Sequence, residues 1–152
     1  MTEQGTYKFK KDSKLSNYYE CNVRYDGIMY KSSEAAYQAA KFNNITIKYE
    51  MSKIDPDSAK RYARKLEALG CIRPDWEYVK DRIMYEICLS KFTSNYDCRK
   101  TLLQTGNRII IENTTGWHDV YWGKCYCKEC NGHGLNKLGL ILMRVRDMVR
   151  NI

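Results

Sequence analysis

No run of eighteen consecutive apolar residues occurs in this 152-residue sequence. A membrane-spanning helix needs about twenty such residues, so we expect no membrane span and no membrane partner. The first fourteen residues are polar and rich in lysine, whereas a secretory signal contains an apolar stretch. These two absences predict an intracellular protein, in the cytoplasm or the nucleus.

Internal repeats, linkers and low-complexity tracts are absent as well. The length is typical of one domain, and we expect residues 1–152 to form that domain as a monomer. Apolar residues make up 43% and charged residues 29% of the chain. Because this balance allows a buried core to form, it excludes a disordered or fibrous protein.

A concentrated basic tail is also missing. The chain has 26 Lys and Arg against 18 Asp and Glu, so its formal net charge is +8, and the excess is spread along the whole length. A cationic surface of this kind suits the phosphates of nucleotides or nucleic acid. Because basic proteins without such a partner have similar charges, the charge favours an anionic partner without identifying one.

The seven cysteines are an odd number, whereas secreted disulfide frameworks usually have an even one. A reducing compartment is therefore expected. Three cysteines crowd together at Cys125, Cys127 and Cys130, and His133 follows them. The spacing C-x-C-x2-C-x2-H supplies four ligands of the types that bind zinc, so it predicts a structural zinc site at these residues. The alternative is a loop of free thiols, since ordinary zinc ribbons use two separated pairs of ligands.

Three segments have the composition of β-strands. Residues 23–32 are two β-prone runs joined by Asp26-Gly27, a pair that tolerates the positive φ angles of a tight hairpin turn. Aromatic and basic residues alternate in 7–10, which predicts a further strand with one buried face. The β-branched run 108–112 predicts a central strand. Residues 15–19 are predicted to form a loop.

Four segments are predicted to be helical. The first is the alanine-rich stretch 34–42, for which Ser32 and Ser33 offer an N-cap. The second runs from Asp55-Pro56 to Gly70. The third begins at Pro74-Asp75 and has apolar residues at helical spacing, and the fourth covers 138–149. The chain is therefore predicted to be α+β, with a small β-sheet that includes the N-terminal hairpin, surrounded by several helices.

Several groups of residues, in order along the chain, carry a resemblance to a known family. They are Leu15–Tyr18; Tyr30–Glu34 with Tyr37–Phe42; Trp76 with Lys91-Phe92; and Asp119–Gly123 with Asn136–Gly139 and Leu142–Arg146. Together they resemble the NADAR family, the YbiA-like proteins, from about Tyr7 to the C-terminus. The resemblance implies an α+β fold and an N-glycosidase, which splits the bond between a ribose anomeric carbon and a nitrogen.

Cleavage of an N-glycosidic bond puts positive charge on the sugar, so the site needs a carboxylate, an acid for the leaving nitrogen and a nucleophile. Glu34, Lys41 and Asp119 can supply these groups, and Glu34 and Lys41 fall on the acidic and lysine positions of the family. On a helix, Glu34, Gln38 and Lys41 stand at i, i+4 and i+7 and share one face, about 10 Å long. Alternatively, Glu34 and Lys41 are ordinary partners of the helix dipole.

The resemblance suggests a role for each of the three catalytic candidates. Glu34 is expected to be a general acid or base, or to stabilise the sugar cation. Lys41 is expected to attack or polarise the anomeric carbon. Asp119 is expected to orient water or hold a ribose hydroxyl, with a cap of its own loop as the alternative. No cofactor is expected to be required for this chemistry.

A set of seven residues is predicted to bind the substrate. Indole rings can stack on a base, and core packing is the alternative for both tryptophans. Glycines let backbone N–H groups approach phosphate, so the glycine-rich loop before the last helix is predicted to bind phosphate. A plain turn is the alternative for the two N-terminal members. The seven residues are Asn17, Tyr18, Gln38, Trp76, Trp122, Gly123 and Asn136.

The resemblance implies two substrate classes. One is ADP-ribosylated guanine in DNA or RNA, and the other is a phosphoribosylamino-pyrimidine intermediate of riboflavin synthesis. The net charge favours the larger anion, the ADP-ribosylated nucleic acid. A non-catalytic module that binds ADP-ribose or nucleic acid is the alternative from another class. Because such a module has no use for both Glu34 and Lys41 on one face, their joint presence favours the enzyme.

Overall fold

The computed structural model describes residues 5–152, and residues 1–4 of the polar N-terminal stretch lie outside the described residues. The contacts between residues divide the chain into two compact units. The central unit comprises residues 17–95, and the terminal unit comprises residues 5–16 and 96–152. The single domain predicted for residues 1–152 stays a prediction.

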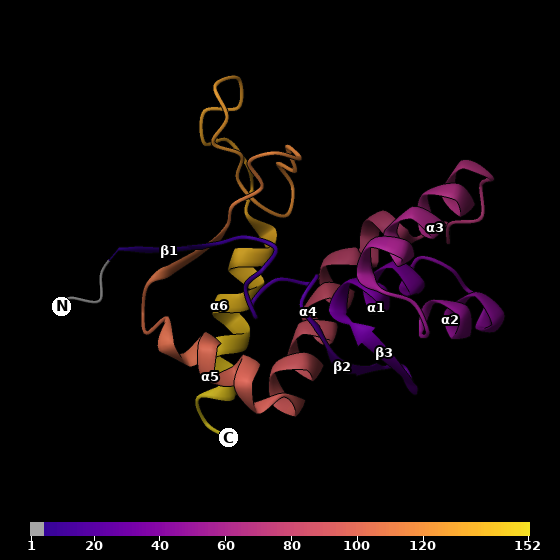
Figure 1. Cartoon of the computed structure of the whole chain (residues 1–152), viewed down its shortest axis with the longest axis horizontal. Coiled ribbons are helices and arrows are strands. Elements are labelled where there is room, and N and C mark those ends of the chain that lie inside the picture. Colours follow the sequence, from indigo (N-terminus) through magenta and orange to yellow (C-terminus); the bar gives the residue numbers. More distant parts are fainter. Residues whose placement is uncertain (1–4) are drawn as a thin grey trace. The chain divides into compact units, whose positions relative to one another are not determined.

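The predicted hairpin is present in the central unit (Figure 1). Strand β2 (Glu20–Tyr25) pairs antiparallel with strand β3 (Ile28–Ser32). Asp26 and Gly27 join the two strands with φ angles of 51° and 83°. Two consecutive residues with positive φ form the turn whose twist matches that of the strands, which is why Asp-Gly predicted the hairpin correctly.

Helix α1 (Ser33–Ala40) begins directly after β3. The hydroxyl of Ser32 accepts a hydrogen bond from the backbone N–H of Ala35 over 3.0 Å, which confirms the predicted N-cap. All eight residues of α1 are buried. The neighbours of α1 explain this burial. The hairpin packs against α1, and so do three further helices: α2 (Ile45–Met51), α3 (Pro56–Ala68) and α4 (Trp76–Ser94).

The helices α3 and α4 were predicted and α2 was not. Helix α3 begins at the predicted cap, where Asp55 Oδ1 accepts the N–H of Ser58 over 2.7 Å, and Gly70 follows its end with a φ of 78°. Helix α4 has 19 residues, and its predicted apolar face is buried except for Val79, which is half-buried. This face lies against α1 and β2.

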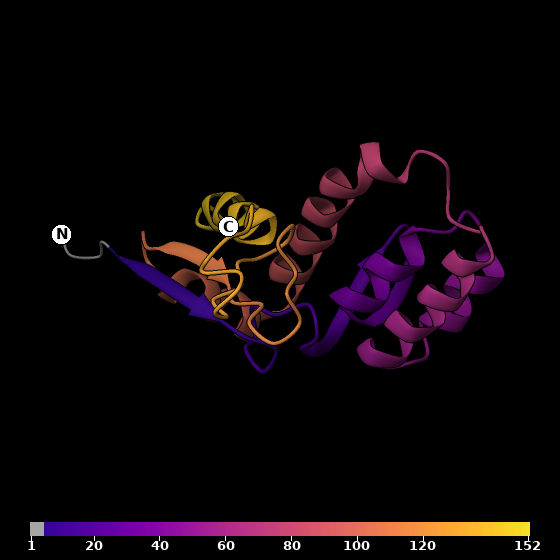
Figure 2. The same cartoon turned by 90° about the horizontal axis from the view of Figure 1, so that it is seen from above.

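The terminal unit contains a second two-stranded sheet. Strand β1 (Thr6–Phe9) pairs in parallel with strand β4 (Ile109–Glu112), and Tyr7 lies opposite Ile110. Figure 2 shows the indigo β1 beside the orange β4. The prediction that 108–112 is a central strand is wrong, because within residues 5–152 β4 has β1 as its one partner strand. Helix α6 buries the strand instead of a second neighbouring strand, since α6 packs against β4.

Two helices complete the terminal unit, the unpredicted α5 (Tyr96–Gln104) and the predicted α6 (Lys137–Val149). Buried Arg146 of α6 donates hydrogen bonds to Thr105 Oγ1 and to the carbonyl of Arg108, both over 2.9 Å. In the described part of the chain, no helix is both long and apolar enough to cross a membrane. With two small sheets and six helices among residues 5–152, the protein has the predicted α+β class.

The N-cap of α1 provides a test of this architecture. Replacing Ser32 with alanine is expected to lower the free energy of unfolding by about 1 kcal/mol, because the buried N–H of Ala35 loses its acceptor. Urea unfolding followed by circular dichroism measures the change.

Ser94→Ala is the matched control, because Ser94 is the exposed last residue of α4. It is expected to change the free energy of unfolding by less than about 0.5 kcal/mol. Equal unfolding midpoints for the two variants would contradict the role of Ser32 as a cap.

Candidate functional site

Two polar side chains of α1 meet inside the central unit. Glu34 is 8% exposed and Gln38 is 4% exposed. Gln38 Nε2 donates a hydrogen bond to Glu34 Oε2 over 2.6 Å, so the predicted i, i+4 neighbours are in contact. Gln38 Oε1 is buried and has no hydrogen-bond partner among the described residues. Because buried amide oxygens are normally satisfied, this atom is suited to a donor group of a ligand.

Lys41 is the C-cap residue of α1, one position beyond its last residue, Ala40, whereas the predicted helix extended to residue 42. Its Nζ forms an ion pair with Glu67 Oε2 over 2.9 Å. The same Nζ lies 5.6 Å from the ring centroid of Tyr37 and 6.0 Å from that of Trp76. An ammonium group at these distances is attracted by aromatic faces. The lysine side chain therefore lies beside a carboxylate and two aromatic rings.

Glu67 is a candidate functional residue that the sequence analysis missed. It lies on α3, 26 positions from Lys41, so no local spacing connects the two residues. Its side chain is 34% exposed, against 13% for that of Lys41. A carboxylate at hydrogen-bond distance from an amine is placed to accept its proton. This arrangement matters for any mechanism in which Lys41 attacks as a neutral amine.

Trp76 is 5% exposed, so core packing, the alternative proposed for it, does occur. Its ring lies 5.1 Å from that of Tyr37, at an angle of 58°. Arg73 closes the end of α1 beside it, because its backbone N–H donates to the carbonyl of Lys41 over 2.8 Å. The Arg73 side chain is held in turn by Asp75, over 2.6 and 3.0 Å. The lysine and its aromatic neighbours thus have a rigid support.

Asn17 and Tyr18 lie against the start of α1. The carbonyl of Asn17 accepts the N–H of Glu34 over 3.0 Å, and its Oδ1 accepts the hydroxyl of Ser33 over 2.8 Å. Burial raises the pKa of Tyr18, and the negative charges of Glu34 and Asp57 raise it further. Tyr18 is therefore a neutral phenol near the Glu34 carboxylate, and the predicted loop orients the catalytic candidate.

Asp119 and Trp122 belong to the terminal unit. Asp119 Oδ1 accepts the backbone N–H groups of Tyr121 and Trp122, over 2.9 and 2.8 Å. This is the loop cap that was the alternative for Asp119. The half-buried Trp122 ring stands edge-on to Tyr121, with 4.9 Å between centroids. A catalytic role for Asp119 and a stacking role for Trp122 stay predictions.

Asn136 and Gly123 hold the glycine-rich loop against β4. Asn136 Nδ2 donates to the carbonyl of Ile110 over 2.9 Å, and its Oδ1 accepts the N–H of Glu112 over 3.1 Å. A Cβ at Gly123 would lie 2.5 Å from the carbonyl oxygen of Glu112, so only glycine fits there. Both predicted substrate residues thus have a structural role in the described chain.

The predicted phosphate site at the start of α6 is largely occupied by the protein itself. The backbone N–H of Lys137 donates to the carbonyl of Tyr121 over 3.1 Å, and the N–H of Leu138 donates to the carbonyl of Trp122 over 2.9 Å. Phosphate binding at a helix start requires such N–H groups to be available. Two of the first donors of α6 are therefore committed to the loop.

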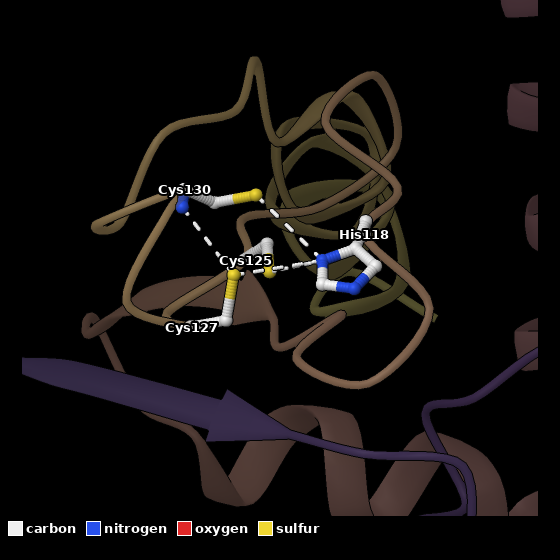
Figure 3. Close-up of side chains that lie close together, drawn as sticks. All are labelled: His118, Cys125, Cys127 and Cys130. Atoms are coloured by element: carbon white, nitrogen blue, oxygen red, sulfur yellow. Dashed lines mark hydrogen bonds between the residues drawn. The ribbon is translucent and has the colours of Figure 1, made fainter.

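The three predicted cysteine ligands lie together, and the histidine beside them is His118. Cys125, Cys127 and Cys130 gather around His118, and all four ligand atoms lie within 4.8 Å of one another (Figure 3). His133 is not part of this group, because its Nδ1 lies 2.6 Å from the carbonyl oxygen of Cys130 and the residue is exposed. The backbones of Cys125 and His133 are paired in an isolated antiparallel bridge. None of the seven cysteines forms a disulfide.

The predicted site residues divide between the two units. Glu34 and Lys41 belong to the central unit, whereas Asp119 belongs to the terminal unit. Of the predicted substrate residues, Asn17, Tyr18, Gln38 and Trp76 lie in the central unit, and Trp122, Gly123 and Asn136 lie in the terminal unit.

The NADAR domain matches residues 4–150 of this sequence. The chain belongs to the NADAR family. This confirms the family identified from the sequence. The NMR structure of the protein YbiA from Escherichia coli superposes with a TM-score of 0.80 at 27% identity, and the match covers 97% of this chain and 86% of that one. The α+β fold is therefore shared by both proteins.

NADAR relatives with curated names fall into two groups. A riboflavin biosynthesis protein of Vibrio vulnificus is 32% identical over 148 residues, and an N-glycosidase of Nostoc punctiforme is 43% identical over 81 residues. This chain spans only 38% and 48% of the lengths of these two proteins. The N-glycosidase YbiA of Shigella boydii is 31% identical over 136 residues, which is 89% of this chain and 80% of that protein.

Asn136 provides a test of the structural role found for the loop. Asn136→Ala is expected to lower the free energy of unfolding by about 1–3 kcal/mol, because it leaves the N–H of Glu112 and the carbonyl of Ile110 without their partner. Chemical unfolding measures the loss. Asn43→Ala is the control, because Asn43 is exposed; a loss of the same size at both positions would contradict the role of Asn136.

Proposed function

We propose that this chain is an N-glycosidase that removes ADP-ribose from ADP-ribosylated guanine in DNA or RNA. The observation that carries the proposal is the arrangement around α1, where a buried Glu34–Gln38 pair and a Lys41–Glu67 pair flank aromatic rings. The unpartnered Oε1 of Gln38 offers an acceptor to a ribose hydroxyl or a base N–H. The N-glycosidase names of the Nostoc and Shigella relatives support the same bond cleavage.

The proposed reaction proceeds through a lysine–sugar adduct. Lys41 passes a proton to Glu67 and attacks the anomeric carbon. As the new C–N bond forms, the bond to the base breaks, and its electron pair leaves with the base nitrogen, which takes up the proton that Glu67 received. The carboxylate of Glu34 stabilises the positive charge on the sugar. The lysine–sugar adduct then opens: the nitrogen forms a double bond to the anomeric carbon, the ring C–O bond breaks, and the ring oxygen takes the proton that the nitrogen loses. Water hydrolyses the resulting Schiff base and returns the free lysine and the free sugar.

This bond cleavage uses only groups of the protein and water. Neither oxidation nor reduction occurs, so no redox cofactor is required. The leaving base carries away the electron pair of the broken bond, and in the proposed reaction this step does not use a metal ion. We therefore propose that any metal ion bound by this chain has a structural role.

The nucleic-acid substrate is favoured by charge and by exposed cation–aromatic pairs. The net charge is +8, which attracts polyphosphates. In the terminal unit, Lys8 Nζ lies 4.0 Å from the ring centroid of Tyr126, and Lys11 Nζ lies 4.8 Å from that of Trp117. Surfaces that combine cations with aromatic rings are typical of proteins that bind single-stranded nucleic acid.

A second candidate substrate is a phosphoribosylamino-pyrimidine intermediate of riboflavin synthesis. The relatives named as riboflavin biosynthesis proteins, from Vibrio vulnificus and from maize, favour it. The same Lys41 and Glu34 chemistry applies, because this substrate also joins ribose to nitrogen.

A parallel assay separates these functions. The purified protein is incubated with an ADP-ribosylated guanine oligonucleotide and with the pyrimidine intermediate, and the released ADP-ribose and ribose 5-phosphate are measured by chromatography. We expect faster release from the oligonucleotide. Faster release from the pyrimidine would identify the second candidate. Tight binding of both without any release would leave a non-catalytic binding module.

The role of Lys41 is tested with Lys41→Arg, which keeps the charge opposite Glu67 but has no amine to form a Schiff base. Turnover is expected to fall at least about a hundredfold, and borohydride is expected to trap a protein–sugar adduct in the wild type only. Mass spectrometry detects the adduct. Exposed Lys65→Arg is the matched control and is expected to behave as the wild type. Unchanged turnover in Lys41→Arg would overturn the nucleophile assignment.

A further inference from the structure

Three thiols of the terminal unit point at one nitrogen atom. His118 Nδ1 lies 3.3 Å from Cys125 Sγ, 3.5 Å from Cys127 Sγ and 3.7 Å from Cys130 Sγ (Figure 3). An imidazole nitrogen has either one proton to donate or one lone pair to accept a proton. A hydrogen bond can therefore account for one of these three contacts and not for all of them.

The separations agree with the edges of a tetrahedral zinc site. Zinc binds sulfur at about 2.3 Å and imidazole nitrogen at about 2.0–2.1 Å, so two such ligands at the tetrahedral angle lie about 3.5 Å apart. The three observed nitrogen–sulfur distances surround this value. All four ligand atoms also lie within 4.8 Å of one another. Three cysteines and one histidine are a common ligand set for structural zinc.

The backbone supports the same arrangement of the thiols. The N–H of Cys130 donates to Cys127 Sγ over 3.3 Å, which stabilises negative charge on that sulfur. The N–H of Gly132 donates to the carbonyl of Cys125 over 2.7 Å. Asn131 and Gly132 both have positive φ angles, 51° and 81°. This tight turn reverses the chain direction directly after Cys130, so that the three sulfur atoms stay close to one another.

His118 comes to the thiols from another part of the loop. Its φ angle is 57°, in the left-handed region, which costs energy for a residue with a side chain. Such a conformation is kept where the surroundings hold it, often at functional sites. The N–H of His118 donates to the carbonyl of Thr114 over 2.9 Å, which fixes the turn that presents the ring.

We propose that His118, Cys125, Cys127 and Cys130 bind one structural zinc ion. Four protein ligands complete a tetrahedron, so no position is left for substrate or water, as is usual in structural and not in catalytic zinc sites. The ligands are soft thiolates and an imidazole, which exclude magnesium and calcium as the resident ion. The site lies outside the chemistry proposed for α1.

The ion adds a cross-link to the long loop of the terminal unit. Residues 113–136 contain neither a helix nor a strand, apart from two isolated bridges, whereas ordinary loops rarely exceed about 12–15 residues. Zinc ties His118 to the turn at 125–130. His118 directly precedes Asp119, whose carboxylate caps the backbone at Trp122. The proposed ion therefore positions the segment that carries these two predicted site residues.

The decisive experiment measures metal content and affinity in matched variants. The protein is purified without chelators, its affinity tag is removed, and zinc is determined by mass spectrometry and by competition with a chromogenic chelator. We expect one zinc per chain in the wild type and in His133→Ala. We expect His118→Ala to bind zinc at least about 10–100-fold more weakly, and Cys127→Ser to retain none.

Two results would overturn the proposal. One is a wild type that neither contains zinc nor takes it up from a buffered zinc solution. The other is His133→Ala losing zinc as His118→Ala does, which would restore the ligand predicted from the sequence. Circular dichroism of each variant identifies loss of fold, and the zinc affinity of the wild type does not depend on any variant folding.

A spectroscopic measurement on the wild type tests the ligand set directly. Cobalt is substituted for zinc, and three thiolates are expected to give strong sulfur-to-cobalt charge-transfer bands with the visible bands of a tetrahedral ion. Bands of an octahedral ion, or a disulfide among the three cysteines in place of metal, would contradict the site. Because none of these readouts is activity, failure of the zinc proposal and failure of the N-glycosidase proposal are distinguishable.

Discussion

Helix α1 has no face toward solvent, since the hairpin, α2, α3 and α4 cover all eight of its residues. Any polar side chain on this helix must therefore find its partner inside the protein, because an unsatisfied buried group is costly. The carboxylate of Glu34 accepts a hydrogen bond from Gln38 for this reason. The alanines at 35, 36, 39 and 40 allow the close packing that imposes this constraint. A buried carboxylate with fixed neighbours is the result.

Lys41 occupies the position where this burial ends. It follows α1 directly as the C-cap, and its long side chain reaches Glu67 on α3 and the rings of Tyr37 and Trp76. The dipole of α1 favours a positive charge at its C-terminus, so the structural and the catalytic interpretations of Lys41 are compatible. The catalytic role of Lys41 is our proposal.

In the terminal unit, a long loop with little regular backbone pairing is held in place mainly by side chains. Asn136 connects the start of α6 to β4 through both atoms of its amide, and Gly123 allows the loop to approach β4 closely. The side chain of Asp119 orders the turn before them. A zinc ion at the cysteines adds the remaining cross-link in our proposal. Side chains therefore do here what strand pairing does in the hairpin of the central unit.

Features that depend on neighbouring residues were predictable from the sequence. The Asp26-Gly27 turn, the Ser32 cap and the start of α3 at Asp55 each follow from the chemistry of one or two residues. Helix α2 was missed because Ile45, Thr46 and Ile47 are β-branched and disfavour a helix locally. Its N-cap by Asn44 and the burial of Met51 against the rest of the central unit override that preference.

The sequence by itself determined the family, the fold class and the residue types available for chemistry. Only the tertiary structure decided which atoms meet. Glu67 reaches Lys41 from 26 positions away, and His118, not His133, joins the thiols. Spacing along the chain predicts contacts within one helix or one turn. Spacing carries no information on contacts between segments that are distant along the chain. Such contacts depend on packing, or on a residue with positive φ such as His118.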